Sequence, residues 1–239
     1  MKEEEQLLVI IPARGGSKGI PGKNIKPLLG RPLLHYTIDV ARTVAPDSHI
    51  ILSTDSPEIA RAAEDVGLDV PYMRPESLAG DTSSTRDAIL DVMDYADRTG
   101  IKYDKICLLQ PTSPMRTADD VKRCLELYKD DLDMVTTIVE SDTNPYFNCY
   151  EIDSDTGFMH ISKGDGCLVR RQDAPEAFQF NGAVYIINPR SIRSTEIGAM
   201  KRRKGVVMDK IRSVDLDTPL DWTIAEVIMK SLNSEKHES

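Results

Sequence analysis

The feature that most constrains this chain is a loop rich in glycine and cations directly after a short apolar run. The run Leu7–Ile11 is β-branched and stopped by Pro12, which predicts a buried strand. The loop, residues 13–24, contains four glycines, two lysines and one arginine, and a helix is expected over Pro32–Ala45. Glycines allow close backbone approach, and clustered cations suit an anion with several oxygens. Strand, loop and helix together predict a phosphate-binding site.

The glycine spacing excludes two common phosphate-binding motifs. The fifth residue after Gly15 is Ile20 and the fifth after Gly16 is Pro21, so G-x-x-x-x-G-K-[ST] is absent. The dinucleotide motif G-x-G-x-x-G is absent as well. From this stretch alone, a glycine-rich surface turn with solvated lysines remains an alternative.

The same loop carries a resemblance to a known family. Residues 13–19 (Ala-Arg-Gly-Gly-Ser-Lys-Gly), followed by Lys23-Asn24, resemble the signature of the acylneuraminate cytidylyltransferases, or CMP-sialic acid synthetases. The resemblance continues in chain order through Leu108–Pro114, Arg171-Gln172, Asn181–Ala183 and Ser213–Asp217. Members of this family join CTP to a nonulosonic acid, a nine-carbon 2-keto sugar acid, and release pyrophosphate.

Length and composition suit one α/β domain. The 239 residues are 40% hydrophobic and 29% charged. Strand patterns at 49–52, 68–72, 105–109 and 134–139 alternate with amphipathic helix patterns, which predicts parallel pairing. The resemblance implies a Rossmann-like three-layer α/β/α nucleotidyltransferase with a mostly parallel sheet.

Residues 140–180 interrupt this alternation. Short strand patterns at 147–152 and 158–161 flank a turn, which predicts a hairpin. The resemblance implies that 140–180 is a small dimerisation and substrate-binding excursion within a single cytidylyltransferase domain, 1–239. The basic run Lys201–Lys204 is expected to be a solvated loop.

Charge and hydropathy limit the possible partners. The formal net charge of −9 argues against nucleic acid, and it means that a triphosphate must be held by local cations and a metal. No apolar run approaches membrane-spanning length, and the acidic start lacks the apolar region of a signal peptide. A cytoplasmic protein without a membrane partner is expected.

Asp215-Leu216-Asp217 is the second chemical element. In an extended chain, residues two apart point to the same side, so the two carboxylates converge while Leu216 faces away. Thr218-Pro219 then begins a helix. Magnesium prefers a few carboxylates together with phosphate oxygens and water, so the pair predicts an Mg²⁺ site. The alternative is a charge that merely flanks the helix N-terminus.

Two polar segments lie where ligands of a parallel sheet bind. Gln110 follows the strand at 105–109, and its side chain suits a base edge or sugar hydroxyls, although a proline-stiffened turn without a ligand is equally compatible. Ser84 or Thr85 is a natural N-cap, and both hydroxyls could also contact a nucleotide.

The resemblance implies specific roles for residues of this chain. The catalytic and metal-binding set is Arg14, Lys23, Asp215 and Asp217, with the metal on the two aspartates. The nucleotide-binding set is Ala13, Arg14, Gly15, Gly16, Ser17, Lys23, Asn24, Arg74, Ser83 and Ser84. The sugar-binding set is Gln110, Thr112, Arg171, Asn181, Gly182 and Tyr185.

Arg171 matches a position where the family supplies an arginine from the neighbouring subunit of a homodimer, and it would hold the sugar's carboxylate. Asn148 departs from the family, because some members carry a lysine for the sugar about there.

The expected reaction is attack of the sugar acid's anomeric hydroxyl on the α-phosphate of CTP. No residue stands out as a general base. Two alternatives stay open from the sequence. The acceptor could be another keto-deoxy sugar acid such as 3-deoxy-octulosonate, or the chain could be a catalytically silent nucleotide-binding regulator.

Overall fold

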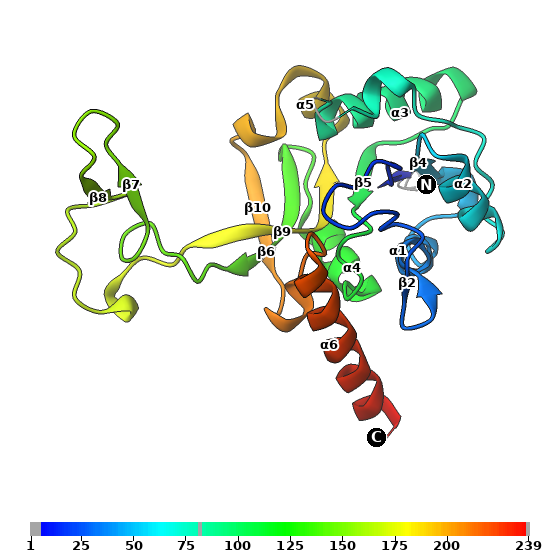
Figure 1. Ribbon diagram of the computed structural model, residues 1–239. Helices are drawn as coiled ribbons and strands as arrows, with labels where there is room; N and C mark the ends of the chain where they lie inside the picture. Colours follow the sequence, from blue (N-terminus) through cyan, green and yellow to red (C-terminus); the bar gives the residue numbers. More distant parts are fainter. Residues whose placement is uncertain (1–5, 81–82, 238–239) are drawn as a thin grey trace.

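The central sheet orders its strands β10-β6-β9-β5-β1-β4 (Figure 1). The computed structural model describes residues 6–80 and 83–237; the acidic start on which the signal-peptide argument depends lies largely outside these ranges. The strands are β1 Leu7–Pro12, β4 Ile50–Ser53, β5 Lys105–Leu109, β6 Met134–Glu140, β9 Phe178–Ile187 and β10 Arg203–Val207. Only β9 runs antiparallel to its neighbours in this sheet, β5 and β6, so the expectation of a mostly parallel sheet is confirmed.

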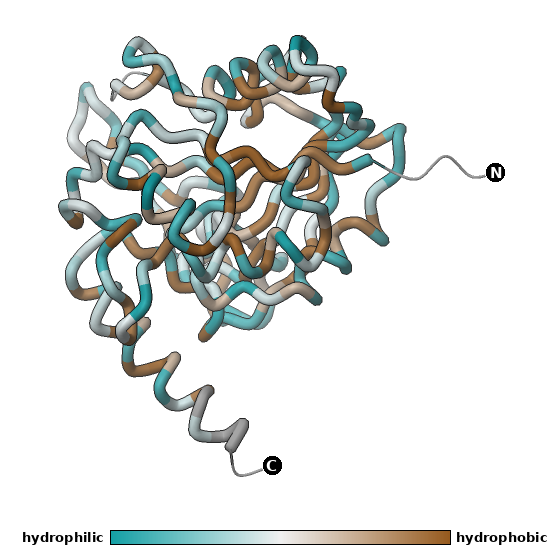
Figure 2. Tube along the Cα trace, turned by 90° about the vertical axis from the view of Figure 1, so that its right-hand side faces the viewer, coloured by the Kyte–Doolittle hydropathy of each residue, from teal (hydrophilic) through white to brown (hydrophobic). Residues whose placement is uncertain are grey.

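Helices cover both faces of the sheet because its strands are apolar on both sides. In β1, Leu7, Val9 and Ile11 point into one core, and Leu8 and Ile10 point into the other. The first face is covered by α1 (Leu33–Arg42), α2 (Pro57–Glu64) and α4 (Ala118–Leu127), and the second by α3 (Thr85–Thr99) and α5 (Pro189–Ser194). Figure 2 shows the resulting hydrophobic interior. The three-layer prediction is confirmed.

A third, smaller core joins the two chemical elements of the sequence. It contains Ile20 from the glycine-rich loop, Leu216 from between the two aspartates, and Trp222 from α6 (Pro219–His237). The small hairpin of β2 (Pro27–Leu28) and β3 (Arg31–Pro32) adds Leu28. The glycine-rich loop and the aspartate segment therefore pack into the same small hydrophobic core.

One strand expectation and one loop expectation need correction. Residues 68–72 form no strand, since Pro71 lacks a backbone donor, and just beyond them Arg74 N bonds to Thr54 O at 2.8 Å. The basic run 201–204 is exposed as expected, yet its second half begins β10, with Arg203 paired to Met134. Exposed cations are compatible with that strand because β10 lies at the sheet edge.

The excursion forms a separate hairpin of β7 (Tyr150–Ile152) and β8 (Met159–Ile161), both shorter than expected. It projects away from the central sheet (Figure 1). Several large apolar side chains on it are exposed: Tyr150, Ile152, Phe158, Met159 and Val169. Within the described ranges, no helix is long and apolar enough to cross a bilayer.

Candidate active site

The glycine-rich loop is fastened to the carboxyl ends of β1 and β4. Ala13 N donates to Ser53 O at 2.9 Å, and Gly15 N donates to Asp55 Oδ1 at 2.9 Å. The buried Asn24 side chain donates from Nδ2 to Arg14 O at 3.0 Å and closes the loop on itself. Because these groups are engaged, the Ala13 and Gly15 amides support the loop rather than offering donors to a phosphate.

Gly19 lets this loop pack directly against the aspartate segment. A Cβ at Gly19 would lie 2.0 Å from Asp217 O, which no side chain could accommodate. On the other side of that contact, Leu216 is fully buried and its amide donates to Thr112 O at 3.0 Å. The two aspartates therefore flank a buried leucine, as the alternation predicted.

Lys23 links the loop to the aspartates electrostatically. Its Nζ donates to Leu216 O and lies 3.2 Å from Asp217 Oδ1. The Lys23 side chain is largely covered, whereas the Asp217 carboxylate is mostly exposed. A predicted phosphate ligand and a predicted metal ligand are thus already adjacent.

Asp215 is a carboxylate without enough partners. Burial raises its pKa above its ordinary value of 3.8, and the charge of Asp217 adds to this, while Thr112 and Lys23 oppose it. Its Oδ1 is buried and makes no hydrogen bond, a situation shared among the described residues only with Arg116 Nε. A divalent cation would supply what this oxygen lacks, so the pair Asp215 and Asp217 fits a metal that takes its remaining ligands from phosphate and water. No group of three or more ligating side chains occurs in the described part of the chain.

Loop and aspartates open onto one cleft of about 650 Å³ at the carboxyl ends of β1, β4 and β5. Eleven predicted site residues line it: Arg14, Ser17, Lys23, Asn24, Arg74, Ser83, Ser84, Gln110, Thr112, Asp215 and Asp217. In an open α/β sheet this edge is where ligands bind.

Arg74 and Ser84 line the same cleft. Arg74 is buried and donates from Nε to Ser53 Oγ at 3.0 Å and from Nη2 to Ser53 O at 2.9 Å. Burial lowers its pKa, but a guanidinium remains charged at neutral pH. Ser84 is the N-cap of α3 in a capping box with Asp87, so the positive end of that helix faces the cleft.

A wide bulge in β9 shapes the far end of the site. Pairing with β6 shifts from Thr136–Tyr185 to Ile138–Phe180, which leaves Asn181–Val184 outside that ladder, although Val184 still pairs with Leu109 of β5. Gly182 has φ +75°, and a Cβ there would lie 3.0 Å from Gln110 Oε1. Asn181 is buried below, where its Oδ1 accepts from Thr137 Oγ1 at 2.7 Å. Gly182 borders the site, whereas Asn181 supports the bulge.

A second cavity of about 260 Å³ adjoins the first, sharing Ser84, Thr85, Leu108 and Gln110 with it. Tyr185, a predicted sugar ligand, lines this cavity together with Phe180 and Ile197. Arg86 is the one cation of its described lining, and all three of its nitrogens donate within the chain, to Ile192 O, Arg193 O and Glu196 Oε1.

Arg171 does not join this site within one chain. It begins a short 3₁₀ turn (Arg171–Asp173) in the excursion and donates from Nη2 to Ser141 O at 3.1 Å. Asn148 closes a turn nearby, accepting from Asn144 N at 2.7 Å and donating to Asp142 O at 3.2 Å. Neither residue lines a described cavity of its own chain.

Several lining residues were missed from the sequence. Lys18 and Gly19 lie inside the recognised loop motif, which was a usable signal. Leu78, Gly80, Ala88 and Ile89 also line the cleft. These last four carry no motif, because α3 and the turn before it reach the cleft only through tertiary packing. Conversely, Ala13, Gly15 and Gly16 were predicted ligands but do not line it.

The fold and cleft together define an α/β nucleotide-binding protein of the Rossmann-like type, in which the cations of the glycine-rich loop and the paired carboxylates line one cleft. A sequence model of the cytidylyltransferase family matches residues 8–235. This match covers the glycine-rich loop, the bulge and the aspartate pair in one family profile. The chain therefore belongs to the cytidylyltransferase family, and it is a nucleotidyltransferase of the acylneuraminate cytidylyltransferase type.

Relatives agree with this assignment. CMP-N,N'-diacetyllegionaminic acid synthase of Legionella pneumophila is 32% identical over 96% of this chain and 98% of its own length. N-acylneuraminate cytidylyltransferase of Escherichia coli is 31% identical over 97% of this chain, but over only 54% of its own length. Pseudaminic acid cytidylyltransferase of Campylobacter jejuni is 26% identical over 93% of this chain and 96% of its own length.

Solved structures share the fold. CMP:2-keto-3-deoxy-manno-octonic acid synthetase complexed with CTP superposes with a TM-score of 0.68 at 19% identity, over 95% of this chain and 99% of that one. A 4-diphosphocytidyl-2C-methyl-D-erythritol synthase superposes with a TM-score of 0.64 at 8% identity, over 95% of this chain and 100% of that one. The predicted nucleotidyltransferase fold is confirmed.

Proposed function

We propose that this enzyme transfers CMP from CTP to a nonulosonic acid and releases pyrophosphate. The observation that carries the proposal is the meeting of the cationic loop and the aspartate pair in one cleft, through the Lys23–Asp217 contact and the fit of Gly19 against Asp217 O. Relatives named for legionaminic, acylneuraminic and pseudaminic acids support this class of acceptor.

The phosphates of CTP would lie between the loop and the aspartates. Phosphoryl-type transfer depends mainly on positioning and on compensating negative charge. We assign Arg14 and Lys23 to the phosphates, with Arg74 and the N-terminus of α3 adding positive potential to the same cleft. Asp215 and Asp217 would hold Mg²⁺, which when bound compensates phosphate charge that these acids would otherwise repel.

The acceptor would occupy the second cavity, beside Gln110 and Tyr185. Its carboxylate needs a cation, yet Arg86, the one cation of the described lining, is engaged within the chain. We therefore propose that Arg171 of a second subunit completes the site in a homodimer. The exposed apolar side chains of the excursion, such as Ile152 and Phe158, support a dimer contact there.

The test is pyrophosphate release from CTP and magnesium with a panel of acceptors: neuraminic, legionaminic and pseudaminic acids, and the eight-carbon 3-deoxy-octulosonate. Release with at least one nine-carbon acid, and little with the eight-carbon acid, is expected. Release with the eight-carbon acid alone would replace the acceptor class. No release with any acceptor would contradict the proposal.

A further inference from the structure

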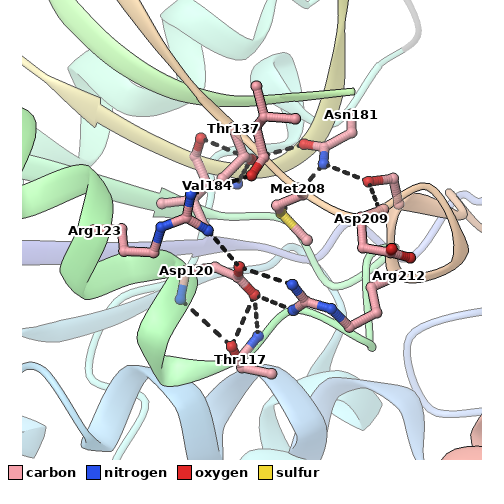
Figure 3. Close-up of polar contacts among 11 residues, drawn as sticks. Thr117, Asp120, Arg123, Thr137, Asn181, Val184, Met208, Asp209 and Arg212 are labelled. Atoms are coloured by element: carbon pink, nitrogen blue, oxygen red, sulfur yellow. Dashed lines mark hydrogen bonds and ion pairs between the residues drawn. The ribbon is translucent and has the colours of Figure 1, made fainter. Parts of the chain in front are cut away.

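Asp120 is a buried carboxylate with more partners than its local role requires. It is 1% exposed and forms a capping box with Thr117 at the start of α4, accepting from Thr117 N at 2.9 Å and from Thr117 Oγ1 at 2.8 Å. The same carboxylate also pairs with Arg212, with Nη1–Oδ2 at 2.5 Å and Nη2–Oδ1 at 3.3 Å (Figure 3). Arg212 lies 92 residues further along the chain.

Helix capping does not explain this arrangement. At α3 the same kind of box is formed by Ser84 and Asp87, and those contacts are exposed. Burying an ion pair costs desolvation free energy that the attraction often only offsets. Burial works against the charge of Asp120, yet Arg212 and Thr117 keep its pKa below the ordinary value. The Asp120–Arg212 ion pair therefore has a role beyond capping the N-terminus of α4.

The position of Arg212 indicates that use. It lies in a 3₁₀ turn (Ile211–Ser213) just before Asp215. A second tie fixes the same turn, because Asn181 Nδ2 donates to Ser213 Oγ at 3.0 Å and Ser213 Oγ donates to Asp209 O at 2.7 Å (Figure 3). Arg212 itself does not line the nucleotide cleft.

Asp215 depends on its flanking chain for its position. One of its carboxylate oxygens has no hydrogen-bond partner, so its own contacts hold it only in part. Downstream it is fixed by the buried Leu216, and upstream by the turn that Arg212 ties to α4. Displacement of such a ligand by a fraction of an ångström weakens a metal site, since outer residues orient the ligands.

We propose that Arg212, held by Asp120, is a positioning residue that sets the Asp215 carboxylate for divalent cation binding and turnover. This inference rests on the proposed function, because it takes Asp215 as a metal ligand. Arg212 touches neither the nucleotide cleft nor the acceptor cavity, so its effect is transmitted through the backbone of 212–215.

The experiment compares Arg212→Met and Arg212→Lys with the wild type. The matched control is Arg202→Met, which removes an exposed pair with Asp131 at 2.7 Å. Binding of Mn²⁺ alone is measured by electron paramagnetic resonance. The kcat and the KM for CTP are measured separately, with a sugar acid that the wild-type enzyme accepts as substrate. Arg212→Met should weaken Mn²⁺ binding and lower kcat by about 10- to 100-fold, the range for outer residues of metal sites. KM for CTP should change much less, Arg212→Lys should recover part of both losses, and the control should match the wild type.

A structural role alone gives a different result. If Arg212→Met only destabilises the fold, the folded fraction will bind Mn²⁺ with wild-type affinity, and the inference is overturned. If Arg212→Met does not fold, Ser213→Ala is used instead, because it removes the hydrogen bonds of Ser213 to Asn181 and Asp209. Ser213→Ala should also weaken Mn²⁺ binding, by a smaller factor. Unchanged Mn²⁺ affinity in Ser213→Ala would likewise overturn the inference. Absence of Mn²⁺ binding in the wild type, with CMP transfer intact, would instead contradict the metal site on Asp215 and the inference with it.

Discussion

At the scale of single residues, the site combines charges that stabilise the fold poorly. Asp215 is half-buried with an oxygen that makes no hydrogen bond, and Lys23 is mostly covered beside the exposed Asp217. Unpaired buried carboxylates cost free energy in the unliganded protein. Such groups are retained where a ligand satisfies them, so stability and function should separate on substitution.

Asp215→Asn should abolish most transfer activity while making the protein more stable at pH 7. Because its pKa is raised by burial, the aspartate opposes folding when ionised and does not oppose it when protonated. The stability gain of the variant should therefore be full above the raised pKa and shrink as the pH falls toward the ordinary carboxyl value of 3.8. Urea unfolding of both proteins at pH 7 and pH 4.5 measures this, and a gain that grows on acidification would contradict it.

Lys23→Ala should impair CTP use far more than Lys129→Ala does. Lys23 lines the cleft beside Asp217, whereas Lys129 is an exposed lysine outside it. Loss of a positioned, partly desolvated charge should lower kcat/KM for CTP by about 100-fold or more, while a screened surface charge contributes little. Steady-state kinetics with varied CTP provide the measurement, and equal effects of the two substitutions would remove Lys23 from the phosphate site.

At the scale of elements, two glycines decide how separate segments meet. Gly19 lets the glycine-rich loop touch the Asp217 carbonyl, and Gly182 turns the β9 bulge toward Gln110. In both cases a side chain would force apart two segments that carry site residues. The glycines thus determine contacts between elements rather than the conformation of one turn alone.

Gly182→Ala should change kinetics as well as stability. The alanine would adopt φ +75° with its Cβ 3.0 Å from Gln110 Oε1. Gly100→Ala is the matched control, because Gly100 has φ +80° and nothing within 4 Å of an added Cβ. Both substitutions should cost about 1–2 kcal/mol of unfolding free energy. Only Gly182→Ala should raise KM for the sugar acid, and an equal kinetic effect of both would attribute the change to strain alone.

At the scale of the whole molecule, the excursion bears on the proposed homodimer. It exposes large apolar side chains such as Ile152 and Phe158, and it carries Arg171 outside the cavities of its own subunit. A closed two-fold dimer would bury the apolar surface and bring Arg171 to the partner's acceptor cavity.

Mixing two inactive variants tests that arrangement. Arg171→Ala and Asp217→Ala are unfolded, refolded together and assayed. In a mixed dimer with shared sites, one site receives both defects and the other receives neither, so random pairing should restore about a quarter of the wild-type sites. Native mass spectrometry verifies that subunits have exchanged. Activity that stays at background in exchanged dimers would show that Arg171 does not act across subunits.

Much of the fold could be predicted because it depends on local pattern. Short continuous apolar runs indicated β1 and β5, and Ser84, one of the two N-caps offered by the sequence, precedes α3. The strand expected at 68–72 was wrong, since Leu68 and Tyr72 pack into the two cores without strand pairing and Pro71 between them lacks a backbone donor. The orientation of β9 was not predicted, because strand direction depends on where the long connection through the excursion returns.

Sequence alone determined which chemical groups this protein possesses: the cations of residues 13–24, the Asp-Leu-Asp alternation and the glutamine after β5. These follow from residue type and short spacing, which need no knowledge of distant contacts. Tertiary structure decided how those groups meet. Lys23 lies beside Asp217, and Asp120 pairs with Arg212, although the two partners are at least 92 residues apart in the sequence in each case. They meet because core packing brings the ends of the β-strands to one edge of the sheet.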